Sequence, residues 1–178
     1  MRVFILLLML LAFSSVECNE QASLQNFFQF TSDHMKVIDW TKFYLDNMPP
    51  AISGTIAVNG GKALVTSYRF SDHFNSWTLL NSDFNSIKKF LELSHYEIRG
   101  LVVTMGQWSF DCSSKWNGLG KCGNNKCRFV ENVKSQNFLV ACLTKNGGFA
   151  AVVGGIGQRW GACAKLPEVV KKLEAEGI

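Results

Sequence analysis

The sequence predicts an α+β fold, in which helices near both ends of the chain cover a central antiparallel sheet of about six to seven strands. Two observations favour this class. Two pairs of short β-type runs are joined by turns rich in Asn and Gly, at Asn59-Gly60-Gly61 and at Lys145-Asn146-Gly147-Gly148. Connections this short join only antiparallel strands. Helical spacing of apolar residues occurs before, between and after these runs, so the helices can pack on the sheet.

The first expected helix follows Ser32 or Asp33, either of which can serve as its N-cap. It ends at Pro49-Pro50, because proline has no backbone N–H to donate and restricts the residue before it. Its apolar positions recur every three to four residues, which is the period of a helix. They are Val37, Trp40, Tyr44 and Met48.

A hairpin and a second helix follow. Residues 54–58 and 62–67 have the composition of strands and flank the Asn-Gly turn. Residues 69–81 are expected to form a loop. Ser82 or Asp83 then caps a helix whose inner face carries an apolar stripe. The stripe consists of Phe84, Ile87, Phe90 and Leu91.

The second half of the chain alternates strands with turns and closes with a helix. The five expected strands are residues 101–105, 107–112, 127–131, 138–143 and 149–153. Residues 113–126 are rich in Gly, Asn, Lys and Ser and are expected to form a loop. Pro167 is expected in the first turn of the closing helix, where proline is tolerated. Lys171 and Lys172 should face outward, and the inner face should contain Cys163, Leu166, Val169, Val170 and Leu173.

The beginning of the chain has the layout of a secretory signal peptide. Arg2 supplies a positive charge, residues 3–13 are apolar, and a short polar stretch follows. The apolar run is shorter than the ~20 residues that span a bilayer. We therefore expect residues 1–18 to be a cleaved signal, residues 19–36 an N-terminal extension and residues 37–178 the domain, with no later transmembrane span. A retained membrane anchor is the alternative.

The chain contains six cysteines, and Cys18 belongs to the expected signal. Five remain, so a secreted protein would form two disulfides and keep one thiol. We expect the disulfides to use Cys122, Cys127, Cys142 and Cys163. Cys122 and Cys127 flank a tight polar loop and are able to pair locally. No Cys-x-x-Cys is present and the histidines are distant in sequence, so we expect no metal and no other cofactor.

Composition and motifs argue against several functions. The formal net charge is +4, and its lysines are spread along the chain, which disfavours nucleic-acid binding but allows a mild affinity for anionic lipid. No Gly-x-Ser-x-Gly is present. Residues 154–157 follow a hairpin and lack the rest of a phosphate-binding loop. Cys163 is better explained as a disulfide partner than as a nucleophile. We therefore expect a protein that is not an enzyme.

Several segments, in the same order along the chain, resemble the profilin family of small actin-monomer-binding proteins. They are residues 39–44, 56–64, 84–91, 100–108, 143–154 and 163–178. The chain departs from the family in its N-terminal extension, in a longer loop around Trp77 and in an inserted loop between Cys122 and Cys127. The resemblance implies an antiparallel sheet covered by terminal helices, and it implies actin monomer as a partner.

The resemblance also implies a site for proline-rich peptides. In profilins such a peptide stacks on aromatic residues of the first and last helices beside a Trp of the second strand. Here Trp40, with Phe43 or Tyr44 beside it, matches the first-helix part of the site. The strand position falls on Leu64 and the last-helix position on Lys172 or nearby, so half of the platform is missing. Alternatively, Trp40 only packs the helix on the sheet.

By the same resemblance, Arg128, Arg159 and Lys165 fall in the regions that contact actin. A further basic position, on the central hairpin, falls near Asp111-Cys112 and is lost. Each of the three cations is also explained as an ordinary solvated charge. Two functions stay open. One is a profilin-like actin-binding protein, which would act in the cytoplasm with the cytoskeleton if the signal is misread. The other is a secreted interaction or defence module that no longer binds actin.

Overall fold

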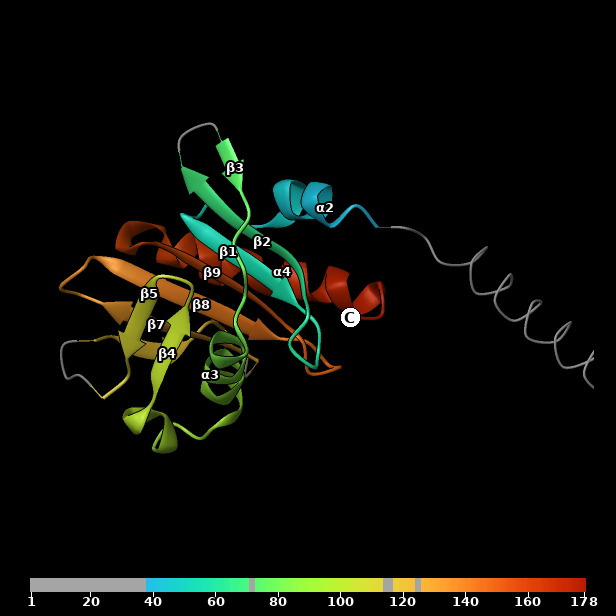
Figure 1. The fold of residues 1–178 in the computed structure, drawn as a ribbon. Helices are drawn as coiled ribbons and strands as arrows, with labels where there is room; N and C mark the ends of the chain where they lie inside the picture. The colour runs from blue at the N-terminus through green and yellow to red at the C-terminus, as the bar shows by residue number, and fades with distance from the viewer. Residues whose placement is uncertain (1–37, 71–72, 114–116, 124–125) are drawn as a thin grey trace, which may run out of the picture. The chain divides into compact units, whose positions relative to one another are not determined.

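A seven-stranded antiparallel sheet forms the centre of the computed structural model, which describes residues 38–70, 73–113, 117–123 and 126–178. The expected signal, residues 1–18, and the expected extension, residues 19–36, lie outside the described residues. The sheet's strands, in spatial order, are β3 (His73–Asn75), β2 (Ala63–Phe70), β1 (Ser53–Ala57), β9 (Phe149–Gly155), β8 (Asn137–Leu143), β7 (Cys127–Asn132) and β6 (Leu119–Lys121). The chain's unit Asp39–Ile178 contains all of them (Figure 1).

Three α-helices and a small second sheet complete this unit. The helices are α2 (Trp40–Asn47), α3 (Asn81–Glu92) and α4 (Arg159–Ala175). Two short 3-10 helices are η1 (Glu97–Gly100) and η2 (Ile156–Gln158). Strands β4 (Val102–Met105) and β5 (Trp108–Asp111) pair with each other and, among the described residues, with no further strand. The α+β class and the antiparallel sheet with helices from both ends of the domain are therefore confirmed.

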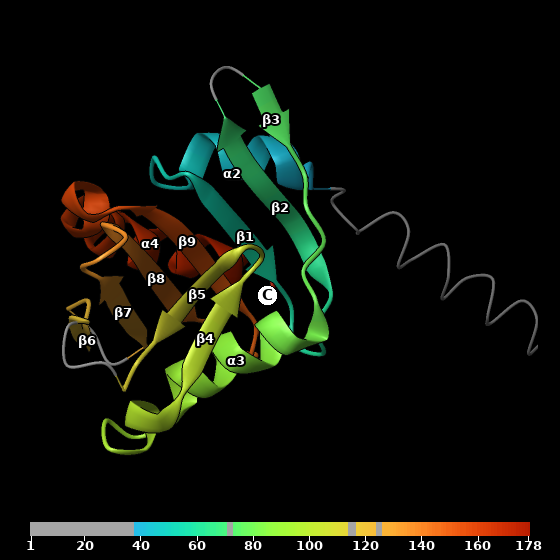
Figure 2. The ribbon, with the colours of Figure 1, turned by 60° about the vertical axis from the view of Figure 1, so that its left-hand side comes forward.

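Each face of the main sheet has its own hydrophobic core. Figure 2 shows α2 and α4 on one side of the sheet, and α3 with the β4–β5 hairpin on the other. Along β8, Val140 and Cys142 belong to the α4-side core, while Leu139 and Ala141 belong to the α3-side core. Successive side chains of a strand point to opposite faces, so the central strands are buried on both sides.

The two predicted hairpins and the inner face of the closing helix are confirmed. β1 pairs with β2 around the Asn-Gly turn, and β8 pairs with β9 around the second turn. On α4 the five predicted apolar residues are buried and Lys171 and Lys172 are exposed. No helix in the described part of the chain is long and apolar enough to cross a membrane.

The predicted start of the first helix is wrong. Helix α2 begins at Trp40, and Asp39 is its N-cap, because the Lys42 backbone N–H donates to Asp39 Oδ1 at 3.0 Å. An Asp at this position satisfies one of the backbone donors that a helix start leaves unpaired. Ser32 and Asp33 lie outside the described residues.

Asp83 is not a helix cap, contrary to the prediction. Helix α3 begins at Asn81 and is preceded by Leu80, and Ser82 is not the cap either. The Asp83 carboxylate is buried and accepts hydrogen bonds from Thr104 Oγ1 at 2.6 Å and from Gly106 N at 3.3 Å. It thereby ties α3 to the β4–β5 turn, a contact between segments about twenty residues apart.

Three further predictions differ from the structure. The expected loops 69–81 and 113–126 contain the short edge strands β3 and β6, which a three-residue pattern is too short to indicate. The closing helix begins at Arg159, so Pro167 lies inside it and removes one hydrogen bond from its ladder. The central hairpin lies on the α3 side as a separate sheet.

Candidate functional site

The predicted aromatic residues of α2 lie together, but they are packed to different depths. The rings of Trp40 and Phe43 meet edge to face, with centroids 5.6 Å apart, and both side chains are half-buried. Tyr44 is buried in the α4-side core. Its hydroxyl occupies the space that a Cβ on Gly54 would fill. Only Trp40 and Phe43 therefore keep ring surface for a ligand, and Tyr44 is a packing residue.

The strand and last-helix positions supply no ring to this surface. Leu64 is half-buried and packs against the α4-side core. Lys172 Nζ on α4 donates to Asn47 Oδ1 on α2 at 2.6 Å. A hydrogen bond thus joins the terminal helices at the position that the resemblance assigns to an aromatic side chain.

Trp77, which follows β3, belongs to the opposite side of the sheet. Its ring packs with the α3-side core and lies near Tyr68, with centroids 6.1 Å apart. Its Nε1 donates to the Ser67 carbonyl at 3.3 Å. A groove of about 450 Å³ runs along β2 between Leu64 and Trp77, and Thr41 of α2 also lines it. This groove continues the surface of α2 toward the edge of the sheet.

Arg159, at the start of α4, forms an ion pair and two cation–π contacts within the protein. Its Nη1 lies 2.8 Å from Glu131 Oε1, and both side chains are largely buried. Its guanidinium carbon is 4.3 Å from the ring centroid of Phe129 and 4.0 Å from that of Trp160. The cation therefore has a carboxylate partner and two aromatic partners, and the exposed ring of Trp160 covers it.

Arg128 lies on the other face of the sheet from Arg159. Residues of β7 alternate, so Phe129 faces α4 while Arg128 reaches α3. Its Nη1 donates to the carbonyls of Phe90 at 2.9 Å and Leu93 at 2.5 Å, at the C-terminal end of α3. Carbonyls at this end carry partial negative charge, which a cation stabilises. Burial lowers the pKa of Arg128.

Lys165 is exposed on α4, 3.4 Å from Glu168 one turn along the helix. The three cations assigned to an actin face by resemblance are therefore not brought together. Arg159 and Lys165 belong to α4, and Arg128 points to the opposite side of the sheet. Lys165 alone among them projects into solvent at the surface.

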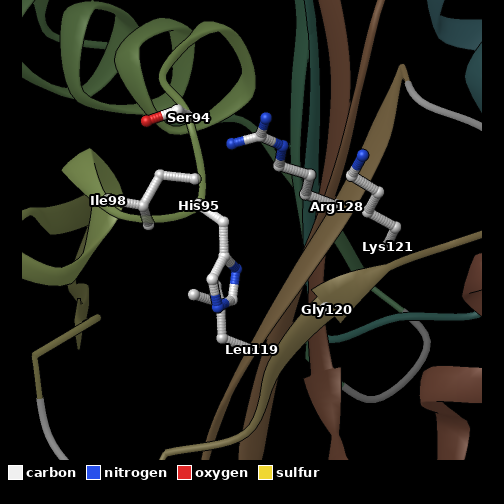
Figure 3. A pocket seen from close by; sticks show the side chains of 7 residues that line it. All are labelled: Ser94, His95, Ile98, Leu119, Gly120, Lys121 and Arg128. Carbon is white, nitrogen blue, oxygen red and sulfur yellow. The ribbon is translucent and has the colours of Figure 1, made fainter.

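A cavity of about 290 Å³ lies next to Arg128, between the segment after α3 and the edge of the sheet. Figure 3 shows Ser94 and Ile98 on one side and Lys121 and Arg128 on the other, with His95 and Leu119 between them in this view. Ile98 is buried and Leu119 is half-buried, so the wall is partly apolar. Sequence reasoning missed Ser94, His95 and Lys121, because they come from two distant segments and form no motif.

Four cysteines form two disulfides, Cys122–Cys163 and Cys127–Cys142. The predicted set of cysteines is confirmed, but the local pairing of Cys122 with Cys127 is wrong. Cys127 lies directly opposite Cys142 in the β7–β8 register, and Cys122 reaches α4 instead. Such bonds are compatible with an extracellular protein.

Cys112 keeps a free thiol in the described part of the chain, buried in the α3-side core. Burial, with a smaller contribution from the charge of Asp111, raises the pKa of this thiol to about 11. A thiol with so high a pKa is a poor nucleophile at neutral pH. Among the described residues no group of three or more His, Cys, Asp or Glu side chains is placed to hold a metal ion.

The fold and these side chains define a class: an α+β domain with two disulfides, two cores and polar surface cavities. Comparisons with models of protein families, with curated proteins and with solved structures find no match to this chain.

Proposed function

We propose that this chain is a profilin-like binding protein, not an enzyme, and that its partner is actin monomer. The observation that carries the proposal is the order of the profilin-like segments, which runs through almost the whole unit Asp39–Ile178. The first and last helices share one face of an antiparallel sheet, which is the arrangement a proline-rich site on both helices would need.

Proline-rich peptides are a weaker second ligand of the same protein. Trp40 and Phe43 supply two rings at the surface, and a polyproline helix loses little entropy on stacking against them. Leu64 and the Lys172–Asn47 hydrogen bond replace the remaining part of the platform. We expect such a peptide to bind through α2 and the adjoining groove along β2, with low affinity.

Actin binding is tested by adding the purified protein to actin monomer and following polymerisation. Delayed polymerisation at tens of micromolar protein, about the range of weak specific binding, is expected. The informative variant is Lys165→Glu, because Lys165 is the exposed member of the three cations. The matched control is Lys62→Glu, an exposed lysine in the β1–β2 turn. Unchanged polymerisation at these concentrations would exclude actin as the partner.

A second candidate is a secreted interaction or defence module that has lost actin binding. A specific observation favours it: Arg128 and Arg159 are both engaged inside the protein, at the end of α3 and in the Glu131 ion pair. The two disulfides support the same candidate. Cells that make the full chain should release it with both disulfides formed. Retention in the cytosol with every cysteine reduced would argue against secretion and for the actin-binding candidate.

A further inference from the structure

The cavity beside Arg128 has a strongly one-sided charge. Arg128 and Lys121 contribute two cations to its lining, His95 contributes an imidazole ring, and no carboxylate is among the lining residues. Glu97, the carboxylate of the adjoining η1 helix, accepts a hydrogen bond from the Ser94 backbone N–H at 2.8 Å. Two cations that line one cavity attract an anion.

Arg128 is a cation with no carboxylate partner in the described part of the chain. Among the described residues its guanidinium forms no ion pair with a carboxylate, and its hydrogen bonds run from Nη1 to two backbone carbonyls. Its Nε is buried and has no hydrogen-bond partner in the described part of the chain. A partly desolvated charge is costly unless it is paired. Arg159, by contrast, has Glu131 as its counter-ion.

The rest of the cavity adds an apolar wall. Ser94 Oγ accepts from the Glu97 backbone N–H at 3.4 Å and points away from Arg128 in Figure 3. Ile98 and Leu119 supply hydrocarbon surface. A volume of about 290 Å³ suits a small organic molecule or one side chain of a partner.

We propose that this cavity binds a small organic anion, with a carboxylate or phosphate group at Arg128 and Lys121 and an apolar body against Ile98 and Leu119. Guanidinium and ammonium groups donate charge-assisted hydrogen bonds to either type of oxygen. Ser94 and His95, from the segment after α3, also line the cavity. The proposal goes beyond actin binding and does not depend on it, because Arg128 and Lys121 would bind the anion whether or not actin is a partner.

The test is a titration of the purified protein, followed by backbone amide NMR, with three probes of similar shape. Phenylacetate and phenyl phosphate carry the two anionic groups, and phenylacetamide is the neutral counterpart. We expect one or both anions to bind with a dissociation constant on the order of 1 mM, as for a small ligand of this size. The shifted amides should be those of Ser94, His95, Lys121 and Arg128. The anion that binds more tightly identifies the group that the cavity prefers.

Variants separate the cavity from general surface charge. Lys121→Glu should lower the affinity for the anion roughly fivefold or more, since reversing one exposed charge changes the binding free energy by about 1 kcal/mol. Lys134→Glu makes the same charge change at an exposed residue that follows the C-terminal end of β7, away from the cavity. It should leave the affinity for the anion unchanged. Arg128 also donates to carbonyls at the end of α3, so replacing it can destabilise the fold. The variant Arg128→Lys keeps the charge. Its thermal unfolding is compared with that of the natural chain before its affinity is measured.

Three results would overturn the proposal. The first is that neither anion shifts the amides of the cavity at ten times the expected dissociation constant. The second is that phenylacetamide binds as tightly as phenylacetate, which would show an apolar cleft without anion selectivity. The third is an equal loss of affinity in Lys121→Glu and Lys134→Glu, which would show attraction by net charge alone. None of these results bears on actin binding, so the two proposals succeed or fail separately.

Discussion

The two faces of the sheet are stabilised in different ways. On the α4 side, all four disulfide-bonded cysteines lie in the core, and Cys122–Cys163 joins the β6–β7 turn to α4. On the α3 side the core contains the free Cys112 and no disulfide. Polar side chains hold that side instead: Asp83 joins α3 to the β4–β5 turn, and Arg128 joins β7 to the end of α3.

The contrast between disulfides on one face and hydrogen bonds on the other indicates where the anion is expected to bind. A covalently joined face has little freedom to rearrange, and its cation, Arg159, is already paired with Glu131. The face joined by hydrogen bonds contains Arg128, which has no carboxylate partner among the described residues, and the cavity that we propose binds an anion. We therefore expect the α4 side to contribute more to stability and the cavity of the α3 side to bind the proposed anion, whereas a proline-rich peptide would bind at the exposed rings of α2.

The largest expected effect comes from removing a disulfide on the α4 side. Cys122→Ala with Cys163→Ala opens a loop with a sequence separation of 41, and Cys127→Ala with Cys142→Ala opens one of 15. Loop-closure entropy predicts losses of about 4 and about 3 kcal/mol in the free energy of unfolding. Urea unfolding without reductant measures both. A smaller loss for the first pair than for the second would contradict the entropic account.

Removal of the buried carboxylate on the α3 side should have the next largest effect. Asp83→Ala leaves the Thr104 hydroxyl and the Gly106 N–H without their acceptor. Buried donors left unsatisfied cost about 1–3 kcal/mol, so we expect a loss of about 2 kcal/mol in the free energy of unfolding. Asp46→Ala is the control, because Asp46 is exposed and forms only a surface ion pair with Lys42. Equal losses in the two variants would show that Asp83 does not link α3 to the hairpin.

A smaller effect is expected where α2 attaches to α4. The Lys172–Asn47 hydrogen bond is exposed to solvent, so Lys172→Ala should cost only about 0.5 kcal/mol. Lys171→Ala, at the neighbouring exposed position, is the control. A double-mutant cycle with Asn47→Ala isolates the contact in thermal unfolding. A coupling energy of zero would mean that α2 is held by its apolar residues alone.

The smallest expected effect is the slow reaction of the buried Cys112 thiol with a thiol-reactive reagent. The rate of this reaction tests how tightly the α3-side core is packed. Because burial raises the pKa of this thiol to about 11, about one molecule in a thousand carries the thiolate at pH 8. A thiol-reactive reagent should therefore modify Cys112 slowly in the native protein and completely in denaturant. Since the native pKa lies above that of the unfolded chain, the proton stabilises the fold at neutral pH. This stabilisation is lost as the pH rises from about 9 toward 11.

A rapid native reaction at pH 8 would show that the α3-side core opens readily, and it would weaken the contrast between the two faces. Cys112→Ala provides the control, because the described part of the chain then contains no other free thiol.

Local patterns in the sequence were sufficient for the hairpins and the closing helix. Asn-Gly turns require positive φ, which Gly60, Gly61 and Gly147 adopt, and such turns pair the strands that flank them. The apolar spacing of α4 predicts its buried face correctly. The edge strands β3 and β6 were missed, because each is only three residues long and is defined by its neighbour rather than by its own pattern.

The candidate site was predicted only in part. The sequence drew attention to Arg128, Arg159 and Lys165 through the resemblance to profilins, yet two of the three turn inward. Whether a surface-type residue points to solvent or to a buried partner depends on segments that lie far away along the chain. Ser94, His95 and Lys121 had no distinguishing pattern, so the cavity they line was not predictable.

Local patterns along the chain were enough to predict the antiparallel hairpins and the alternation of buried side chains, because turn chemistry and short periodicities act over a few residues. The set of four paired cysteines was also predicted from the sequence. The pairing of those cysteines, the composition of each core and the partners of Arg159 and Arg128 became known only from the packing of the folded chain. The physical reason is distance along the chain: these partners are brought together by packing, and no local preference specifies them.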